Sequence, residues 1–206
     1  MAHPPRWANG LLHLLAPTRC PGCDGALPFE VRGFCPVCEP LLDRLRDAPG
    51  AFAFGGPAAE AVHALKYRGR TEHAAVLGEA LAARARRLAG RVDAVVPVPL
   101  HPRRRRARGF NQSDLLGVHV ARSLALPLDR GALRRVRDTL PQARLVGTLR
   151  EDNVRGAFVA RPGGVPRRPL LIDDVRTTGA TFAACAATLR SAGAEQVFAL
   201  AVTCVQ

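Results

Sequence analysis

The part of the sequence with the clearest chemical meaning is an apolar run that ends in two acids and continues into threonine and glycine. Residues 170–172 (Leu-Leu-Ile) read as a buried strand, Asp173 and Asp174 follow directly, and residues 177–181 (Thr-Thr-Gly-Ala-Thr) open a predicted helix. Adjacent carboxylates suit a vicinal diol, because each accepts a hydrogen bond from one hydroxyl. The N–H groups and dipole of a helix start hold a phosphate. The pattern therefore predicts a cradle for ribose 5-phosphate.

Two alternative roles for this segment have less support. A strand that ends in two acids also resembles the Mg²⁺-binding strand of P-loop ATPases, but the sequence contains no G-x-x-x-x-G-K-[ST] loop, which those enzymes need. A purely structural strand, turn and helix would not need two acids, three threonines and a glycine together. The phosphorylated-pentose interpretation is therefore retained.

Four cysteines form a second chemical pattern, with the spacing of a metal site. They stand as two C-x2-C pairs, Cys20 with Cys23 and Cys35 with Cys38. Each pair directs two thiolates to one point, and two pairs complete a tetrahedral site for Zn²⁺. The alternatives are two disulfides, which a chain without a secretion signal does not favour, or a redox pair, which needs no second copy. We predict structural zinc, because four cysteines leave no position open for a substrate.

Basic residues are concentrated in one part of the chain. The net charge is +13, and residues 103–168 carry sixteen arginines against five acids. Such a segment suits a polyanion, whether pyrophosphate, a phosphorylated sugar or nucleic acid. Lys66 is the only lysine in a chain that otherwise uses arginine, which makes it a candidate for a specific role.

These residues must be positioned by alternating strands and helices. We expect strands at 51–54, 93–99, 133–136, 169–173 and 196–205, and helices at 7–15, 58–67, 72–88, 110–124, 142–153 and 181–192. The alternation predicts an α/β fold with a mostly parallel sheet flanked by helices. We expect two parts, with an N-terminal helix and zinc knuckle at 1–48 and the α/β domain at 49–206.

No apolar run reaches the roughly 18 residues that span a bilayer, so no membrane insertion is expected. The apolar stretch 11–16 is short, is interrupted by His13 and lacks a small-residue cleavage site. We therefore expect no signal peptide and a cytoplasmic protein. The sequence does not define the oligomeric state.

The segment 173–181 resembles the motif with which type I phosphoribosyltransferases bind 5-phosphoribosyl-1-pyrophosphate (PRPP). The resemblance implies that Asp173 and Asp174 contact the ribose hydroxyls together with Mg²⁺. It implies that the 5-phosphate is held by Thr177, Thr178, Gly179, Ala180 and Thr181.

Other segments are similar to one family of this fold, the ComF-type competence proteins. The similar segments are 96–112, 66–69 (Lys-Tyr-Arg-Gly), the four-cysteine region, Thr139, Gln142, Arg150 and 153–158. They cover nearly the whole chain in order. Amidophosphoribosyltransferases share the transferase half, but this chain lacks their length and their N-terminal cysteine nucleophile. Membership of the ComF family implies a cytoplasmic factor that supports natural transformation, acting on or near incoming single-stranded DNA.

Two further groups of residues are candidates for substrate contacts. The pyrophosphate candidates are Lys66, Arg68, His101, Arg103 and Arg104, with a solvated basic loop or a nucleic-acid contact as the alternative. The candidates for the region that closes over the site are Phe110, Asn111, Gln112, Arg150 and Asn153, although Phe110 also suits the core. No residue stands out as a general base.

Three functional hypotheses remain open at this point. The first is an active phosphoribosyltransferase that uses PRPP and Mg²⁺ on an unidentified acceptor. The second is a module that senses PRPP, and binds single-stranded DNA, without turnover. The third is a scaffold whose zinc knuckle docks DNA-uptake proteins.

Overall fold

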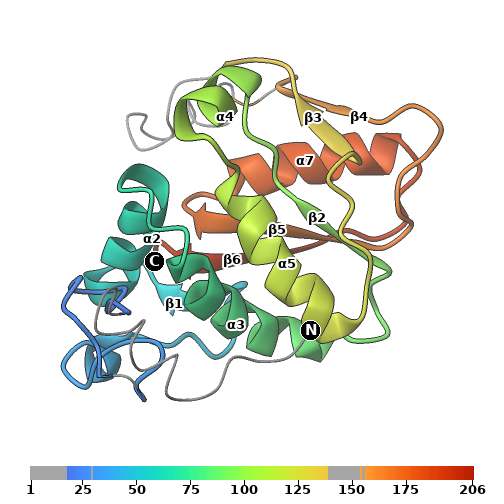
Figure 1. The fold of residues 1–206 in the computed structure, drawn as a ribbon. Coiled ribbons are helices and arrows are strands. Elements are labelled where there is room, and N and C mark those ends of the chain that lie inside the picture. The colour runs from blue at the N-terminus through green and yellow to red at the C-terminus, as the bar shows by residue number, and fades with distance from the viewer. Residues whose placement is uncertain (1–17, 29, 139–153, 155) are drawn as a thin grey trace, which may run out of the picture.

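A computed structural model of the chain describes residues 18–28, 30–138, 154 and 156–206 (Figure 1). Its centre is a four-stranded parallel sheet in the order β1-β6-β5-β2. The strands are β1 (Gly50–Ala53), β2 (Ala94–Pro97), β5 (Pro169–Arg176) and β6 (Phe198–Cys204). Strand β5 is central, because it pairs with β2 on one side and with β6 on the other.

Helices cover both faces of this sheet. The α-helices are α2 (Gly56–Tyr67), α3 (His73–Ala85), α4 (Pro102–Arg108), α5 (Gln112–Leu124) and α7 (Ala180–Ser191). Two 3-10 turns, η1 (Glu39–Leu41) and η2 (Arg86–Leu88), and an antiparallel pair, β3 (Leu133–Arg135) with β4 (Phe158–Ala160), complete the described elements. Helices α3 and α5 lie on one face of the sheet and α7 lies on the other (Figure 1).

The apolar run of β5 explains the two faces. Leu170 and Ile172 are fully buried in the cluster that includes Leu77 of α3 and Leu116 of α5. Leu171 points the other way, into a second cluster with Phe182 of α7. Alternate residues of a strand point to opposite faces, so a continuous apolar run belongs to a strand buried on both sides.

The N-terminal described segment shares the first of these clusters. Leu27, Phe34 and Leu42 are buried together with Phe52 of β1. The rings of Phe34 and Phe52 meet edge to face, with centroids 6.4 Å apart. The cysteine-rich segment is therefore packed against the α/β unit through a common core.

The expected α/β class, with a parallel sheet flanked by helices and an N-terminal four-cysteine cluster, is confirmed. No helix in the described ranges is both long and apolar enough to cross a membrane. The helices expected at 7–15 and 142–153 lie outside the described residues.

Three details differ from the expectation. Strand β5 continues through Arg176, because Val175 and Arg176 pair with β6, so both acids lie within the strand rather than after it. The basic run expected as a loop forms α4, which His101 caps and whose first residue is a proline. The strand expected at 133–136 pairs antiparallel with β4 (Phe158–Ala160) in a separate two-stranded sheet, outside the main sheet.

Candidate functional site

The two acids of β5 lie near the carboxyl end of the central strand, where ligands of open α/β sheets bind. Each is held by a different helix. Ser113 of α5 donates a hydrogen bond to Asp173 (Oγ to Oδ1, 2.9 Å), and Lys66 of α2 contacts Asp174 (Nζ to Oδ2, 2.9 Å). The sheet thus brings residues from three distant parts of the sequence to one place.

Asp173 is a carboxyl group with an unusually high pKa. Burial is the main cause, and repulsion from Asp174 adds to it, so that the pKa rises to about 7. Lys66 and the hydrogen bonds from Ser113 and from the backbone of Asp174 act in the opposite direction. Near neutral pH this group therefore exists both as a carboxylate and as a neutral acid.

Asp174, which is buried, and Lys66, which is partly buried, form an ion pair. Their side chains are 4% and 17% exposed, and the Thr203 hydroxyl also donates to the backbone carbonyl of Asp174 (3.2 Å). Burial lowers the pKa of Lys66, but attraction to Asp174 outweighs it, so the pKa is raised overall and the amine stays charged. Removal of one member of such a pair leaves an uncompensated charge and costs about 3–5 kcal/mol.

The threonine- and glycine-rich turn leads from β5 into α7. Gly179 precedes the helix with φ of 86°, in the left-handed region that favours glycine. A Cβ atom at this position would also lie 3.2 Å from the Nε atom of Arg176. The Ala180 N–H donates to the Thr178 hydroxyl (3.4 Å). The turn therefore presents backbone N–H groups at a helix start, with a guanidinium beside them.

A cavity of about 680 Å³ adjoins this turn. Its lining includes Arg176, Thr178, Gly179 and Ala180, and neither acid of β5 contributes to it. An anion held at the start of α7 would therefore have open space beside it.

Two arginines of α4 and the capping His101 lie around a single acid. Around the carboxylate of Asp138 lie Arg104 Nε (3.3 Å), Arg103 Nη1 (3.7 Å) and His101 Nδ1 (3.9 Å). The same His101 nitrogen accepts the Arg103 N–H (3.3 Å) and so caps the helix. Three of the predicted pyrophosphate ligands are thus grouped around an anion that the chain itself supplies.

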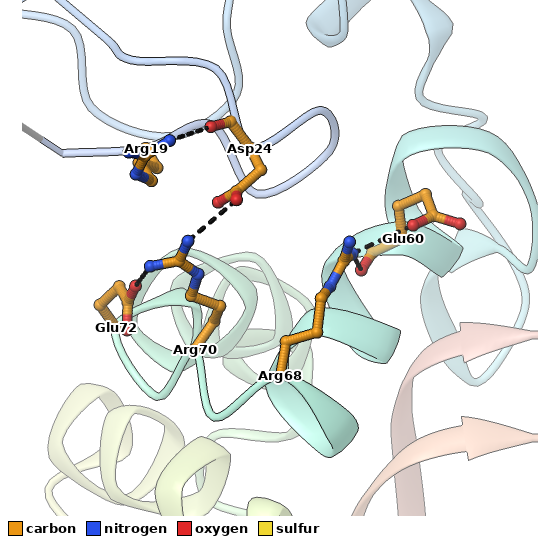
Figure 2. Close-up of polar contacts among 6 residues, drawn as sticks. All are labelled: Arg19, Asp24, Glu60, Arg68, Arg70 and Glu72. Atoms are coloured by element: carbon orange, nitrogen blue, oxygen red, sulfur yellow. Dashed lines mark hydrogen bonds and ion pairs between the residues drawn. The ribbon is translucent and has the colours of Figure 1, made fainter.

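Arg68 is directed elsewhere. Its guanidinium pairs with Glu60 of α2 (3.1 Å), as Figure 2 shows. Both side chains are about half exposed. The structure thus separates Arg68 from the His101, Arg103 and Arg104 group.

The segment after β2 has structural contacts of its own. Asn111 is buried and caps α5 by accepting the Ser113 N–H (3.2 Å), and its amide donates to the Val98 carbonyl (3.1 Å). Gln112 is buried and accepts from Arg108, and Phe110 packs against the core. These predicted substrate residues therefore fix the start of α5. Two others, Arg150 and Asn153, lie outside the described residues.

The four cysteine sulfurs lie within 4.8 Å of one another. Cys23 and Cys35 have their sulfurs 3.8 Å apart, which is the edge of a tetrahedron with metal–sulfur bonds of about 2.3 Å. Backbone N–H groups point at two sulfurs, Cys35 N at Cys20 (3.3 Å) and Cys38 N at Cys35 (3.4 Å). The N–H of Cys38 is the main cause of a Cys35 pKa lowered to about 7. All four thiols are free, and the cluster suits a metal ion.

An ion-pair network ties this cluster to the turn between α2 and α3, as Figure 2 shows. Asp24 accepts from Arg70 (2.9 Å), and its backbone carbonyl accepts from Arg19 (2.9 Å). Arg70 also lies 3.7 Å from Glu72. The turn that follows Lys66 is therefore anchored directly on the cysteine segment.

Two residues of the site escaped the sequence prediction. Ser113 binds Asp173 from 60 positions away, and no local pattern marks it. Arg176 lies inside the acid–threonine motif, with its guanidinium beside Gly179. Its position in the sequence, between the acids and Gly179, could have marked it as a residue of the site.

Together these features define an α/β protein with paired acids on its central parallel strand, a glycine turn at a helix start and a four-cysteine cluster. No protein-family model matches the chain. It is 37% identical over 185 residues to the DNA utilization protein YhgH of Salmonella typhimurium, covering 86% of this chain and 80% of that one. YhgH of Salmonella typhi is 40% identical with the same coverage. Competence protein F of Haemophilus influenzae is 37% identical over 108 residues, covering 51% of this chain and 47% of that one.

The chain therefore belongs to the ComF family, the family of these YhgH and competence proteins. Solved structures with a similar arrangement include an allosteric regulatory enzyme of purine biosynthesis (21% identical, TM-score 0.46, covering 68% of this chain and 30% of that one). Another is adenine phosphoribosyltransferase of Trypanosoma brucei (17% identical, TM-score 0.38, covering 64% and 52%). Family membership rests on the sequence relatives.

Proposed function

We propose that the β5–α7 segment binds PRPP together with Mg²⁺, and that the protein transfers the phosphoribosyl group to an acceptor. The observation that supports this most is the carboxylate pair on the central strand, followed at once by the Gly179 turn. The names of the relatives, DNA utilization protein and competence protein, support a role in DNA utilization and competence. We further propose that the protein handles single-stranded DNA during natural transformation. A cytoplasmic location fits four free cysteines in one cluster, because disulfides are rare there.

In this proposal the two acids have separate tasks. Asp173, oriented by Ser113, accepts from a ribose hydroxyl and offers carboxylate oxygens, the ligands that Mg²⁺ prefers. Asp174, fixed by Lys66, accepts from the other hydroxyl. Bound Mg²⁺ would neutralise the pyrophosphate as it leaves. The 5-phosphate lies against the N–H groups at the start of α7.

Binding of Mg²⁺ and PRPP should depend on pH through Asp173. Because its pKa is about 7, the carboxylate that Mg²⁺ needs is gained as the pH rises from about 6 to about 8. Calorimetric titrations across this range should show affinity rising with an apparent pKa near 7. The Ser113 hydrogen bond stabilises the carboxylate form of Asp173 and so lowers its pKa. Ser113→Ala removes this bond and should therefore move the midpoint to higher pH. PRPP itself also titrates in this range, so Asp173→Asn is the control that shows the contribution of PRPP alone. If Asp173→Asn shows the same pH dependence of binding as the wild type, the dependence does not arise from Asp173.

The pyrophosphate is proposed to bind His101, Arg103 and Arg104 in place of Asp138. Because the Asp138 carboxylate competes for the two arginines, Asp138→Asn should tighten PRPP binding, by about twofold to fivefold for a partly exposed interaction. The effect should be smaller for ribose 5-phosphate, which lacks pyrophosphate. Weaker PRPP binding by Asp138→Asn, measured by calorimetry, would remove these residues from the pyrophosphate site.

The four cysteines are proposed to hold one structural Zn²⁺. The donor set fits the metal, because four thiolates can close a tetrahedral site.

A second candidate function, a non-catalytic sensor of PRPP, is favoured by the Lys66–Asp174 pair, which keeps one acid occupied. Release of pyrophosphate that depends on an added acceptor would identify the enzyme. Saturable PRPP binding without such release, over a broad set of bases and nucleotides, would identify the sensor.

A further inference from the structure

Three aromatic side chains form an exposed row along α2, which we name the aromatic ridge: Phe54, His63 and Tyr67. Phe54 lies just before the helix, and His63 and Tyr67 are one turn apart on the same side. The ring centroids are 6.2 Å apart for Phe54 and His63 and 6.0 Å apart for His63 and Tyr67. Tyr67 is 72% exposed and Phe54 37%. Rings that are gathered on a surface in this way mark a binding site more often than single exposed apolar residues do.

Cations are interleaved with these rings. The Arg108 guanidinium lies 5.5 Å from the Tyr67 ring centroid, at the end of the basic helix α4. Arg68 follows Tyr67 in the chain and is half exposed, paired with Glu60 on the same helix (Figure 2). Rings that stack on bases, next to arginines that contact phosphates, are the combination used to bind single-stranded nucleic acid. The bases of a duplex are already stacked on each other, so they would not reach these rings.

The ridge also lies beside the candidate functional site. Tyr67 immediately follows Lys66, whose amine contacts Asp174 at 2.9 Å. One helix end therefore directs Lys66 inward to the acids and Tyr67 outward to solvent. The ridge and the proposed sugar site are therefore connected through one helix end.

We propose that the aromatic ridge binds the unpaired bases of single-stranded DNA, with Arg108 and Arg68 contacting its phosphates. The inference rests on the proposed role in DNA handling and names the surface that performs it. Phe110, the other aromatic candidate for a substrate contact, packs against the core, which was its alternative role.

The test is fluorescence anisotropy of a labelled oligothymidylate with the full, zinc-loaded chain. Tyr67→Ala should weaken binding about tenfold, as expected for loss of one stacked base, whereas Tyr67→Phe should stay within about twofold. Arg108→Ala should weaken binding and lower its salt dependence. Its matched control is Arg91→Ala, because Arg91 lies over Phe198 in the same way (5.0 Å) but far from the ridge.

The outcomes separate the ridge from the PRPP proposal. No binding of oligothymidylate by the wild-type chain, or equal binding by folded Tyr67→Ala, would overturn the inference. Competition by thymidine monophosphate as strong as by the oligonucleotide would assign the ridge to a mononucleotide and also overturn it. Calorimetry with PRPP on the same samples reports the proposed function independently, and Tyr67→Ala should bind PRPP normally. Loss of DNA binding in Tyr67→Ala supports the ridge even if PRPP binding is absent.

A direct readout uses the fact that Tyr67 is the only tyrosine of the chain. Photo-crosslinking to an oligonucleotide that contains 5-iodouracil should attach the base to Tyr67, and mass spectrometry can locate the adduct. Crosslinks confined to the segment 103–106 would place the DNA on α4 and contradict the ridge.

Discussion

Replacing Asp173 by asparagine is expected to weaken binding of Mg²⁺ and PRPP about 100-fold and to leave the fold intact. The Asn oxygen can still accept from Ser113 and from the backbone of residue 174, so the local geometry is kept. The negative charge is lost, and with it the attraction to Mg²⁺ and the charged hydrogen bond to the ribose. A 100-fold loss corresponds to about 2.7 kcal/mol, within the range of hydrogen bonds to charged groups.

Calorimetry with PRPP and Mg²⁺ measures this affinity, and thermal unfolding checks the fold. Glu195→Gln is the matched control, since Glu195 pairs with Arg167 at the other end of β6, where a lost carboxylate should not matter. Asp174→Asn is expected to behave differently from Asp173→Asn, because it leaves the partly buried Lys66 without its counter-charge and should cost about 3 kcal/mol of stability. Unchanged PRPP affinity in Asp173→Asn would exclude this acid from the sugar site.

Removal of the proposed zinc should destabilise the whole protein rather than the cysteine segment alone. Binding of structural zinc contributes about 10–16 kcal/mol to the folding of isolated fingers. Here Leu27 and Phe34 of that segment share a core with Phe52 of β1, so its loss exposes the main cluster. If zinc binding contributes about 3–5 kcal/mol to the stability of the α/β unit, its removal should lower the melting temperature by on the order of 10 °C.

Two measurements check this expectation. The purified chain should contain one zinc per molecule by elemental analysis, and both a chelator and Cys38→Ser should remove it and lower the melting temperature. Cys185→Ala is the control, because Cys185 is a buried cysteine in the α7 cluster, away from the four sulfurs. A chelated chain that melts at the same temperature would argue against a structural metal.

Local patterns were enough to predict the elements of the site. The acids of β5, the Gly179 turn and the two C-x2-C pairs are contiguous, so their residue types and spacing carry the information. The apolar run 170–172 likewise predicted a buried strand, because a strand covered on both faces reads as a continuous apolar run.

The contacts that tune the site were not predictable in this way. Lys66 and Asp174 are joined only when α2 packs beside the sheet, and Ser113 meets Asp173 only when α5 covers it. A sequence pattern describes neighbours within one element, whereas these pairs arise from tertiary packing. The same reason explains why Asp138 was not expected among the basic residues of α4, and why Tyr67, not Phe110, is the exposed ring.

Binding of a phosphorylated pentose by the paired acids and the glycine turn is the proposal on which every other assignment at this site depends. It is tested by a calorimetric titration of the zinc-loaded, folded wild-type chain with PRPP in the presence of Mg²⁺. We predict saturable binding of one PRPP per chain, lost without Mg²⁺ and strongly reduced in Asp173→Asn. An absence of measurable binding at millimolar PRPP would contradict the proposal.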